Sequence, residues 1–150
     1  MPSLTDQILI KAERIRALQE KGVNKVGDSI EGEFMAIVNY CVIALILLEL
    51  HSKEQRPQPE MNVEIAPLEQ LYDAKIEEVY QTLARKNHDY DEAWRKMRIS
   101  SMTDLILMKL FRLKQIEDHA GTTIISEGPE GNYTDMLNYA VFCLIKMSEE

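Results

Sequence analysis

The sequence predicts an all-α protein, a helical bundle of about five main helices with an internal pseudo-two-fold repeat. Apolar residues recur at helical rather than alternating spacing in its main segments. The chain also matches itself twice: "SLTDQILIKAER" (3–14) aligns with "SMTDLILMKLFR" (101–112), and "EGEFMAIVNYCVIALI" (31–46) aligns with "EGNYTDMLNYAVFCLI" (130–145). Two matching blocks in the same order indicate a duplicated helical unit.

The repeat divides the chain into two units within one predicted domain (1–150). A length of 150 residues with 45% hydrophobic residues suits a single domain with its own core. The first unit covers residues 3–50, and a polar linker containing prolines covers residues 51–66. The second unit, together with a helix that leads into it, covers residues 67–150.

The first helix of each unit is predicted to end at a glycine. Apolar spacing places these helices at about 4–21 and 102–119, ahead of Gly22 and Gly121. A Thr-Asp pair near each start is typical of an N-cap followed by a first-turn acid. The two pairs are Thr5-Asp6 and Thr103-Asp104.

The second helix of the first unit is apolar almost all round. The run Phe34 to Leu50 resembles a membrane span, but it is shorter than the ~20 residues needed and contains Asn39. The central helix of a soluble bundle is the simpler interpretation, so no membrane contact is expected. After Pro67, which suits a helix N1 position, helical apolar spacing predicts the helix that leads into the second unit.

Charge and cysteine content limit the partners and the compartment. With a net charge of −8 the protein repels phosphates, so stable duplex nucleic-acid binding is not expected and an anionic ligand needs a local basic site. Cys41 and Cys143 lie in apolar runs without CxxC spacing, which indicates buried thiols. No signal peptide is visible, and the protein is expected in the cytoplasm.

The segment "KNHDYDEAWRKMR" (86–98) concentrates charged and aromatic residues. In a helix running on through Trp94, the carboxylates of Asp89 and Glu92 lie one turn apart. With Asp135 from another helix they could hold Mg²⁺ or Mn²⁺, since a hard divalent ion needs several oxygen ligands. A solvated helix start and, for Asp135, a first-turn acid are the alternatives. Trp94 itself could stack on a base, although a single Trp beside an apolar helix is more often part of the core.

Further candidates could hold an anionic ligand or a base. Lys109 and Arg112 lie one turn apart on a mostly apolar helix, so they either pair with acids or receive a nucleotide phosphate; structural pairing is the favoured interpretation. Asn138 and Tyr139 could contact a base or only satisfy neighbouring polar groups. His88 completes the set of candidate ligand residues. In a helix running on through Trp94 it lies on one face with Asp91, Glu92 and Arg95, at i, i+3, i+4 and i+7.

Two stretches, "KNHDYDEAWRKMRISSMTDLILMKLFRLKQIE" (86–117) and "NYTDMLNYAVFCLIKM" (132–147), resemble the nucleotide modification associated domain type 1 family. This is a bacterial and phage group known as a domain of unknown function. The resemblance covers nearly the whole chain and implies a helical protein, often with two copies of the unit, that acts on or near modified DNA nucleotides. It implies no established reaction. Many relatives read Asp-Tyr-Gly where residues 89–91 read Asp-Tyr-Asp. This chain therefore lacks the glycine that would favour a tight turn after Tyr90.

The element that precedes the second unit has no copy before the first unit, which begins at Met1-Pro2-Ser3. Relatives tend to carry this element ahead of the first unit, so the resemblance implies a shortened N-terminus. The alternative is that the first unit never had the element. A shortened chain is expected to expose an apolar groove on its N-terminal half, which a homodimer partner could cover.

Two functions therefore remain open. In the first, the protein binds a deoxynucleotide, with Mg²⁺ or Mn²⁺ on the carboxylates and phosphate on Lys109 and Arg112, and metal-activated water hydrolyses the nucleotide phosphate. In the second, it is a non-enzymatic helical binding or assembly module that forms a homodimer, and its charged cluster forms internal salt bridges. The sequence does not decide whether the protein is an enzyme.

Overall fold

The computed structural model describes residues 1–22, 30–52, 65–119 and 128–149. Within these ranges the chain forms five α-helices, one short 3₁₀ helix and no strand, so the predicted all-α class is confirmed. Most of the predicted linker at 51–66 lies outside the described residues. The elements in chain order are α1 (Pro2–Lys21), α2 (Ile30–Ser52), α3 (Ile65–Tyr90), the 3₁₀ helix η1 (Ala93–Lys96), α4 (Ile99–Asp118) and α5 (Pro129–Ser148).

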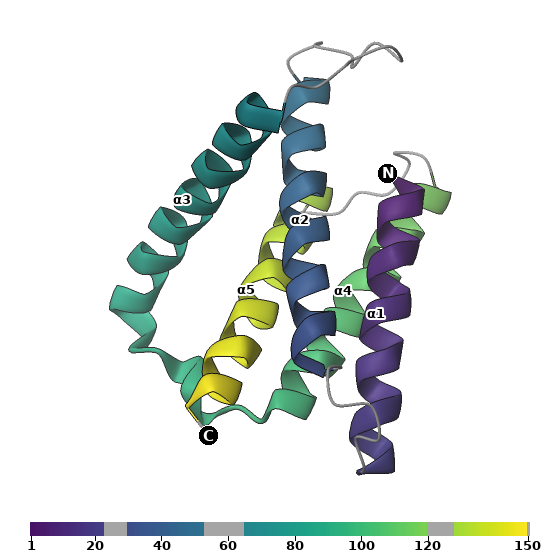
Figure 1. Cartoon of the computed structure of the whole chain (residues 1–150), viewed down its shortest axis with the longest axis vertical. Helices are drawn as coiled ribbons and strands as arrows, with labels where there is room; N and C mark the ends of the chain where they lie inside the picture. The colour runs from purple at the N-terminus through teal and green to yellow at the C-terminus, as the bar shows by residue number, and fades with distance from the viewer. Residues whose placement is uncertain (23–29, 53–64, 120–127, 150) are drawn as a thin grey trace.

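The helices α2 and α5 form the centre of the bundle. They pack against each other, α1 packs on α2, α4 packs on α5, and α1 and α4 also meet. α3 packs mainly against α2 and stands apart from α5, and the chain returns to α5 at η1 (Figure 1). By length and composition α2 could cross a membrane, and here three helices pack against it, as they do against the core helix of a bundle.

Four helices supply most of the core, and α3 supplies little of it. Burying one large apolar side chain contributes about 1.5–3 kcal/mol. Among the described residues of α3, Val79 is the only buried apolar side chain. The fully buried large side chains on α1, α2, α4 and α5 include Ile8, Ile15, Phe34, Ile37, Met102, Ile106, Leu110, Tyr133, Met136 and Leu137. α3 is therefore held less firmly than the other helices.

Contacts between α1 and α4 follow the internal repeat. The alignment of the units equates Thr5 with Thr103, and Gln19 with Glu117. Thr5 Oγ1 donates a hydrogen bond to Glu117 Oε1 (2.5 Å). Gln19 Nε2 donates one to Thr103 Oγ1 (3.1 Å), so the two bonds join equivalent residue pairs with the threonine as donor in one and acceptor in the other. The flanking ion pairs, related in the same way, are Lys114 with Asp6 and Arg16 with Asp104.

Both α1 and α4 begin slightly earlier than the sequence predicts, at Pro2 and Ile99. The prediction that Thr5 and Thr103 mark the starts of these helices as caps is wrong, because both side chains are buried within the helices. Their hydroxyl groups form the interhelix hydrogen bonds described above. The predicted end of α1 is confirmed, since Gly22 is left-handed (φ 63°) and caps the last turn.

α3 ends at Tyr90, so the helix expected to run on through Trp94 is interrupted. Asp91 and Glu92 both adopt left-handed backbone angles (φ 49° and 52°), and η1 begins after this turn. The expectation that the charged residues of 88–95 share one helix face is therefore wrong. A tight turn follows Tyr90 in this chain, with Asp91 and Glu92 at backbone angles that glycine adopts most easily.

Replacing Asp91 by glycine is expected to stabilise the protein by about 0.5–1 kcal/mol, because glycine adopts positive φ without steric cost. The larger conformational freedom of glycine in the unfolded chain limits the gain. Urea unfolding measures the difference. As a control, Asp73→Gly in the exposed interior of α3 should cost roughly a few tenths of a kcal/mol. A less stable D91G variant would mean that the Asp91 side chain itself holds the turn.

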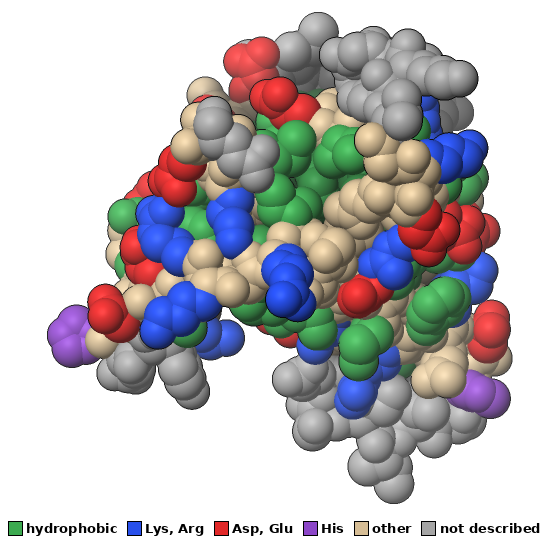
Figure 2. Space-filling model, turned by 90° about the horizontal axis from the view of Figure 1, so that it is seen from below, with side chains coloured by type: hydrophobic (Ala, Val, Ile, Leu, Met, Phe, Trp, Pro, Cys, Tyr) green, Lys and Arg blue, Asp and Glu red, His purple; other side chains and the backbone are tan. Residues whose placement is uncertain are grey.

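Exposed apolar side chains occur on both repeat units. Ile10 of α1 and Met35 of α2 are 56% and 50% exposed, while Met108 and Phe111 of α4 are 64% and 54% exposed. Single exposed apolar side chains therefore occur on both halves of the chain, and the apolar groove of the N-terminal half stays a prediction. On the face seen from below, acidic and basic side chains are mixed, and apolar side chains lie between them (Figure 2).

Candidate functional site

The α3/α5 cleft is lined mainly by residues of α3 and α5. It contains two cavities of about 470 and 290 Å³, and these sizes are near those typical of small-molecule sites. Lys86 and Asp135 each line both cavities. The larger cavity lies beside the start of α5, and the smaller lies beside η1. Other side chains lining the larger cavity include Lys75, Glu78, Thr82, Glu130 and Thr134. Other side chains lining the smaller cavity include Leu83, Asn87, Trp94, Asn138, Tyr139 and Phe142.

Lys75 is a buried charge in the wall of the larger cavity. Its ammonium group lies 2.6 Å from a Glu49 oxygen and 3.0 Å from a Glu78 oxygen. Burial disfavours the charged amine, but hydrogen bonds to the two carboxylates outweigh it and raise the pKa of Lys75 above its ordinary value. Lys75 is thus neutralised by the protein. Lys86 is exposed and forms no ion pair with a described residue, so it is the cation available to a ligand.

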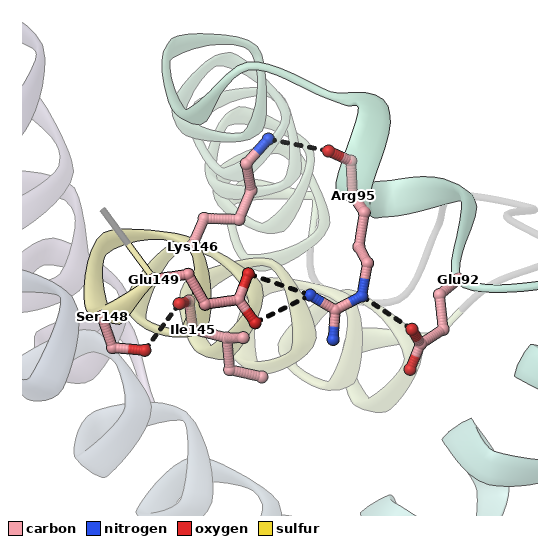
Figure 3. Close-up of polar contacts among 6 residues, drawn as sticks. All are labelled: Glu92, Arg95, Ile145, Lys146, Ser148 and Glu149. Carbon is pink, nitrogen blue, oxygen red and sulfur yellow. Dashed lines mark hydrogen bonds and ion pairs between the residues drawn. The ribbon is translucent and has the colours of Figure 1, made fainter.

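The short helix η1 is fastened to the end of α5 by ionic and hydrogen-bond contacts (Figure 3). Arg95 donates to Glu92 (2.6 Å) and to both oxygens of Glu149 (2.9 and 3.0 Å). The Lys146 ammonium donates to the carbonyl oxygens of Arg95 (3.0 Å) and Met97. These contacts fix the position of Trp94, which η1 carries into the wall of the smaller cavity.

Trp94 is a packing residue and offers no free face to a base. Its ring stacks on Phe142, with 4.4 Å between the centroids and 4° between the planes. The Arg95 guanidinium lies over the Trp94 ring at 4.5 Å, so both ring faces are occupied. The side chain is 8% exposed, and its indole N–H has no hydrogen-bond partner among the described residues. The core interpretation of Trp94 therefore agrees with the structure.

Each repeat unit neutralises its lysine with a carboxylate, but from a different position. Lys109 lies 3.0 Å from Asp135 in the second unit. In the first unit the corresponding Lys11 lies 3.2 Å from Glu33, which also pairs with Arg14 at 2.7 Å. The alignment places Asp135 opposite Ala36, one turn beyond Glu33. The structural pairing favoured for Lys109 is thus present.

The structure brings three of the predicted site residues into the cleft: Asp135, Asn138 and Tyr139. Glu92 lies against Arg95, and Arg112 is exposed on α4 and lines neither cavity.

Two further predicted residues lie at the end of α3 beyond Asn87. His88 is exposed, and the side chain of Asp89 is outside the described part of the structure. Among the described side chains, no three His, Cys, Asp or Glu residues are grouped to hold an ion. The three-carboxylate metal site therefore stays a prediction.

Sequence reasoning missed Lys86 and Asn87 as cleft residues. Both belong to the segment 86–98, in which a continuous helix made the acidic residues the stronger candidates for a site. The useful pattern was the helical spacing of Leu83, Lys86 and Asn87, which places them on one side of α3. The turn at Asp91 and Glu92 then brings Trp94 to the wall of the smaller cavity.

The fold and cleft define an all-α protein with a ligand-sized cavity between its leading helix and its last helix. The model of the family nucleotide modification associated domain 1 matches residues 1–48 and 86–147, so the chain belongs to that family. The matched residues include Lys86, Asn87, Trp94, Asp135 and Asn138, whereas most of α3 lies outside them. No match was found among curated proteins or solved structures.

Proposed function

We propose that the protein binds a nucleotide in the α3/α5 cleft, with the base in the smaller cavity and the phosphate between Lys86 and the larger cavity. The observation that carries this proposal is the composition of the smaller cavity, where amide and carboxylate groups stand beside the exposed amine of Lys86. Membership of a family associated with nucleotide modification supports the ligand class.

The start of α5 supports a phosphate near the larger cavity. Gly128 is the N-cap and has no side chain with which to cap the first N–H groups of this helix. A helix N-terminus favours an anion through these N–H groups and the helix dipole. Lys86 adds a charge-assisted hydrogen bond.

A divalent cation fits this arrangement, because Glu78, Glu130 and Asp135 also line the larger cavity and would repel a bare phosphate. Mg²⁺ is commonly held by one or two carboxylates together with the phosphates of the ligand. Glu130, at the start of α5 beside the proposed phosphate, would supply a carboxylate to Mg²⁺ or Mn²⁺. Hydrolysis by a metal-activated water would be a further step, measured as release of phosphate or pyrophosphate.

Trp94 provides a direct test, because it is the only tryptophan of the chain and lines the smaller cavity. We expect its fluorescence to change in a saturable manner on titration with deoxynucleotides, and binding to tighten when Mg²⁺ or Mn²⁺ is added. Lys86→Ala is expected to weaken binding by about ten-fold, the usual effect of losing a charge-assisted hydrogen bond.

Arg85→Ala is the matched control, since Arg85 is the neighbouring exposed cation and lines neither cavity. It should leave the affinity unchanged within about two-fold. Equal losses in both variants would point to non-specific charge attraction and contradict the proposal. No response to any nucleotide would favour the assembly module, with the exposed apolar residues Ile10, Met108 and Phe111 as its contact surface and a homodimer as the form to look for by sedimentation.

A further inference from the structure

The two repeat units use the same asparagine differently. Asn39 of α2 corresponds to Asn138 of α5. In the first unit, the hydroxyl of Tyr72 donates to Asn39 Oδ1 at 2.6 Å, so an aromatic ring with a donor group satisfies this amide. In the second unit, Asn138 forms no hydrogen bond with a described residue and lines the smaller cavity.

α3 supplies the difference between the two units. Beside Asn39 it presents Tyr72, and about three turns later, beside the smaller cavity, it presents Leu83 and Asn87. No ring from α3 therefore lines the cavity at Asn138 among the described side chains. Asn39 thus pairs with the hydroxyl of an aromatic side chain of α3, whereas the aligned Asn138 faces a cavity.

We propose that this cavity binds a nucleobase carrying an exocyclic amine, with the base related to Asn138 as the Tyr72 ring is related to Asn39. The inference rests on the proposed function and names the part of the nucleotide that is recognised. Asn138 Oδ1 accepts a hydrogen bond from the amine, and its Nδ2 donates to the adjacent ring nitrogen. An asparagine amide pairs with adenine in this bidentate way.

Asp135 selects the class of base. It lies one turn before Asn138 on α5 and lines the same cavity. Its Oδ2 pairs with Lys109 at 3.0 Å, so Oδ1 is the oxygen that faces a ligand, and an ionised carboxylate only accepts hydrogen bonds. Cytosine, adenine and guanine carry an amine that can donate to it. Thymine and uracil offer one N–H between two carbonyl oxygens, and those oxygens would meet the carboxylate unfavourably.

The test compares dCMP and dAMP with dTMP by Trp94 fluorescence and calorimetry. We expect the amino-bearing nucleotides to bind at least about ten-fold more tightly, because a carbonyl oxygen of thymine in the place of the amine would face the Asp135 carboxylate without a hydrogen bond. Asn138→Ala should weaken dCMP and dAMP by about ten-fold, while the matched Asn39→Ala variant should bind them as the parent does. Asp135→Asn should reduce the preference for dCMP and dAMP over dTMP, since an amide can donate to a carbonyl oxygen of thymine.

The outcomes separate this inference from the proposed function. Equal affinities for all three nucleotides, or equal losses of affinity in N138A and N39A, would overturn the recognition of the base by Asn138. The proposed binding of a nucleotide would remain valid in that case. No binding of any nucleotide would overturn both. Circular dichroism confirms that each variant is folded, and if N138A were unfolded, the preference of D135N would decide between the outcomes.

Discussion

Replacing Trp94 by alanine is expected to lower the free energy of unfolding by about 3–4 kcal/mol. The side chain is 8% exposed and stacks between Phe142 and the Arg95 guanidinium, so its loss leaves a cavity and removes a cation–π contact. Urea unfolding followed by circular dichroism measures the effect. The variant should also lose nucleotide binding, because Trp94 forms part of the wall of the smaller cavity.

Two comparison variants show whether packing causes this loss. Trp94→Phe keeps an aromatic ring on Phe142 and should cost about half as much or less. Tyr80→Ala removes a ring that is 58% exposed on α3 and should change stability by less than about 0.5 kcal/mol. A cost for W94A no larger than that for Y80A would show that η1 does not stabilise the fold.

Phe34→Ala is expected to lower the free energy of unfolding by about 3–5 kcal/mol, because this fully buried ring lies in the core of α2. The adjacent Met35 is 50% exposed on the same helix, so Met35→Ala is the matched control and should cost less than about 0.5 kcal/mol. The midpoint and slope of urea unfolding measure both. Similar costs for the two variants would mean that α2 does not turn Phe34 toward the core and Met35 toward the solvent.

The fold was largely predictable because the sequence repeats itself and its apolar spacing is helical. The end of α1 followed from Gly22, where the backbone needs a left-handed residue. The starts of α1 and α4 were placed too late, because Thr5 and Thr103 resemble caps when only local sequence is considered. Their use in bonds between helices depends on the packing of two segments far apart in the chain.

The site was predictable in part. Asp135, Asn138 and Tyr139 were singled out because polar residues in an apolar helix need partners, and all three line the cleft. The break after Tyr90 was not predictable from propensity, since Asp91 and Glu92 are not residues that favour positive φ as glycine does. That break turns Glu92 toward Arg95 and brings Trp94 to the cavity.

The weak attachment of α3 has a kinetic consequence. Because Val79 is its only buried apolar side chain among the described residues, α3 should open locally at a lower free energy than the other four α-helices, and its amide hydrogens should exchange with solvent sooner. One wall of the cleft would then move while the rest of the bundle stays folded. We therefore expect the residence time of a bound ligand to follow the opening rate of α3 rather than the global unfolding rate of the protein.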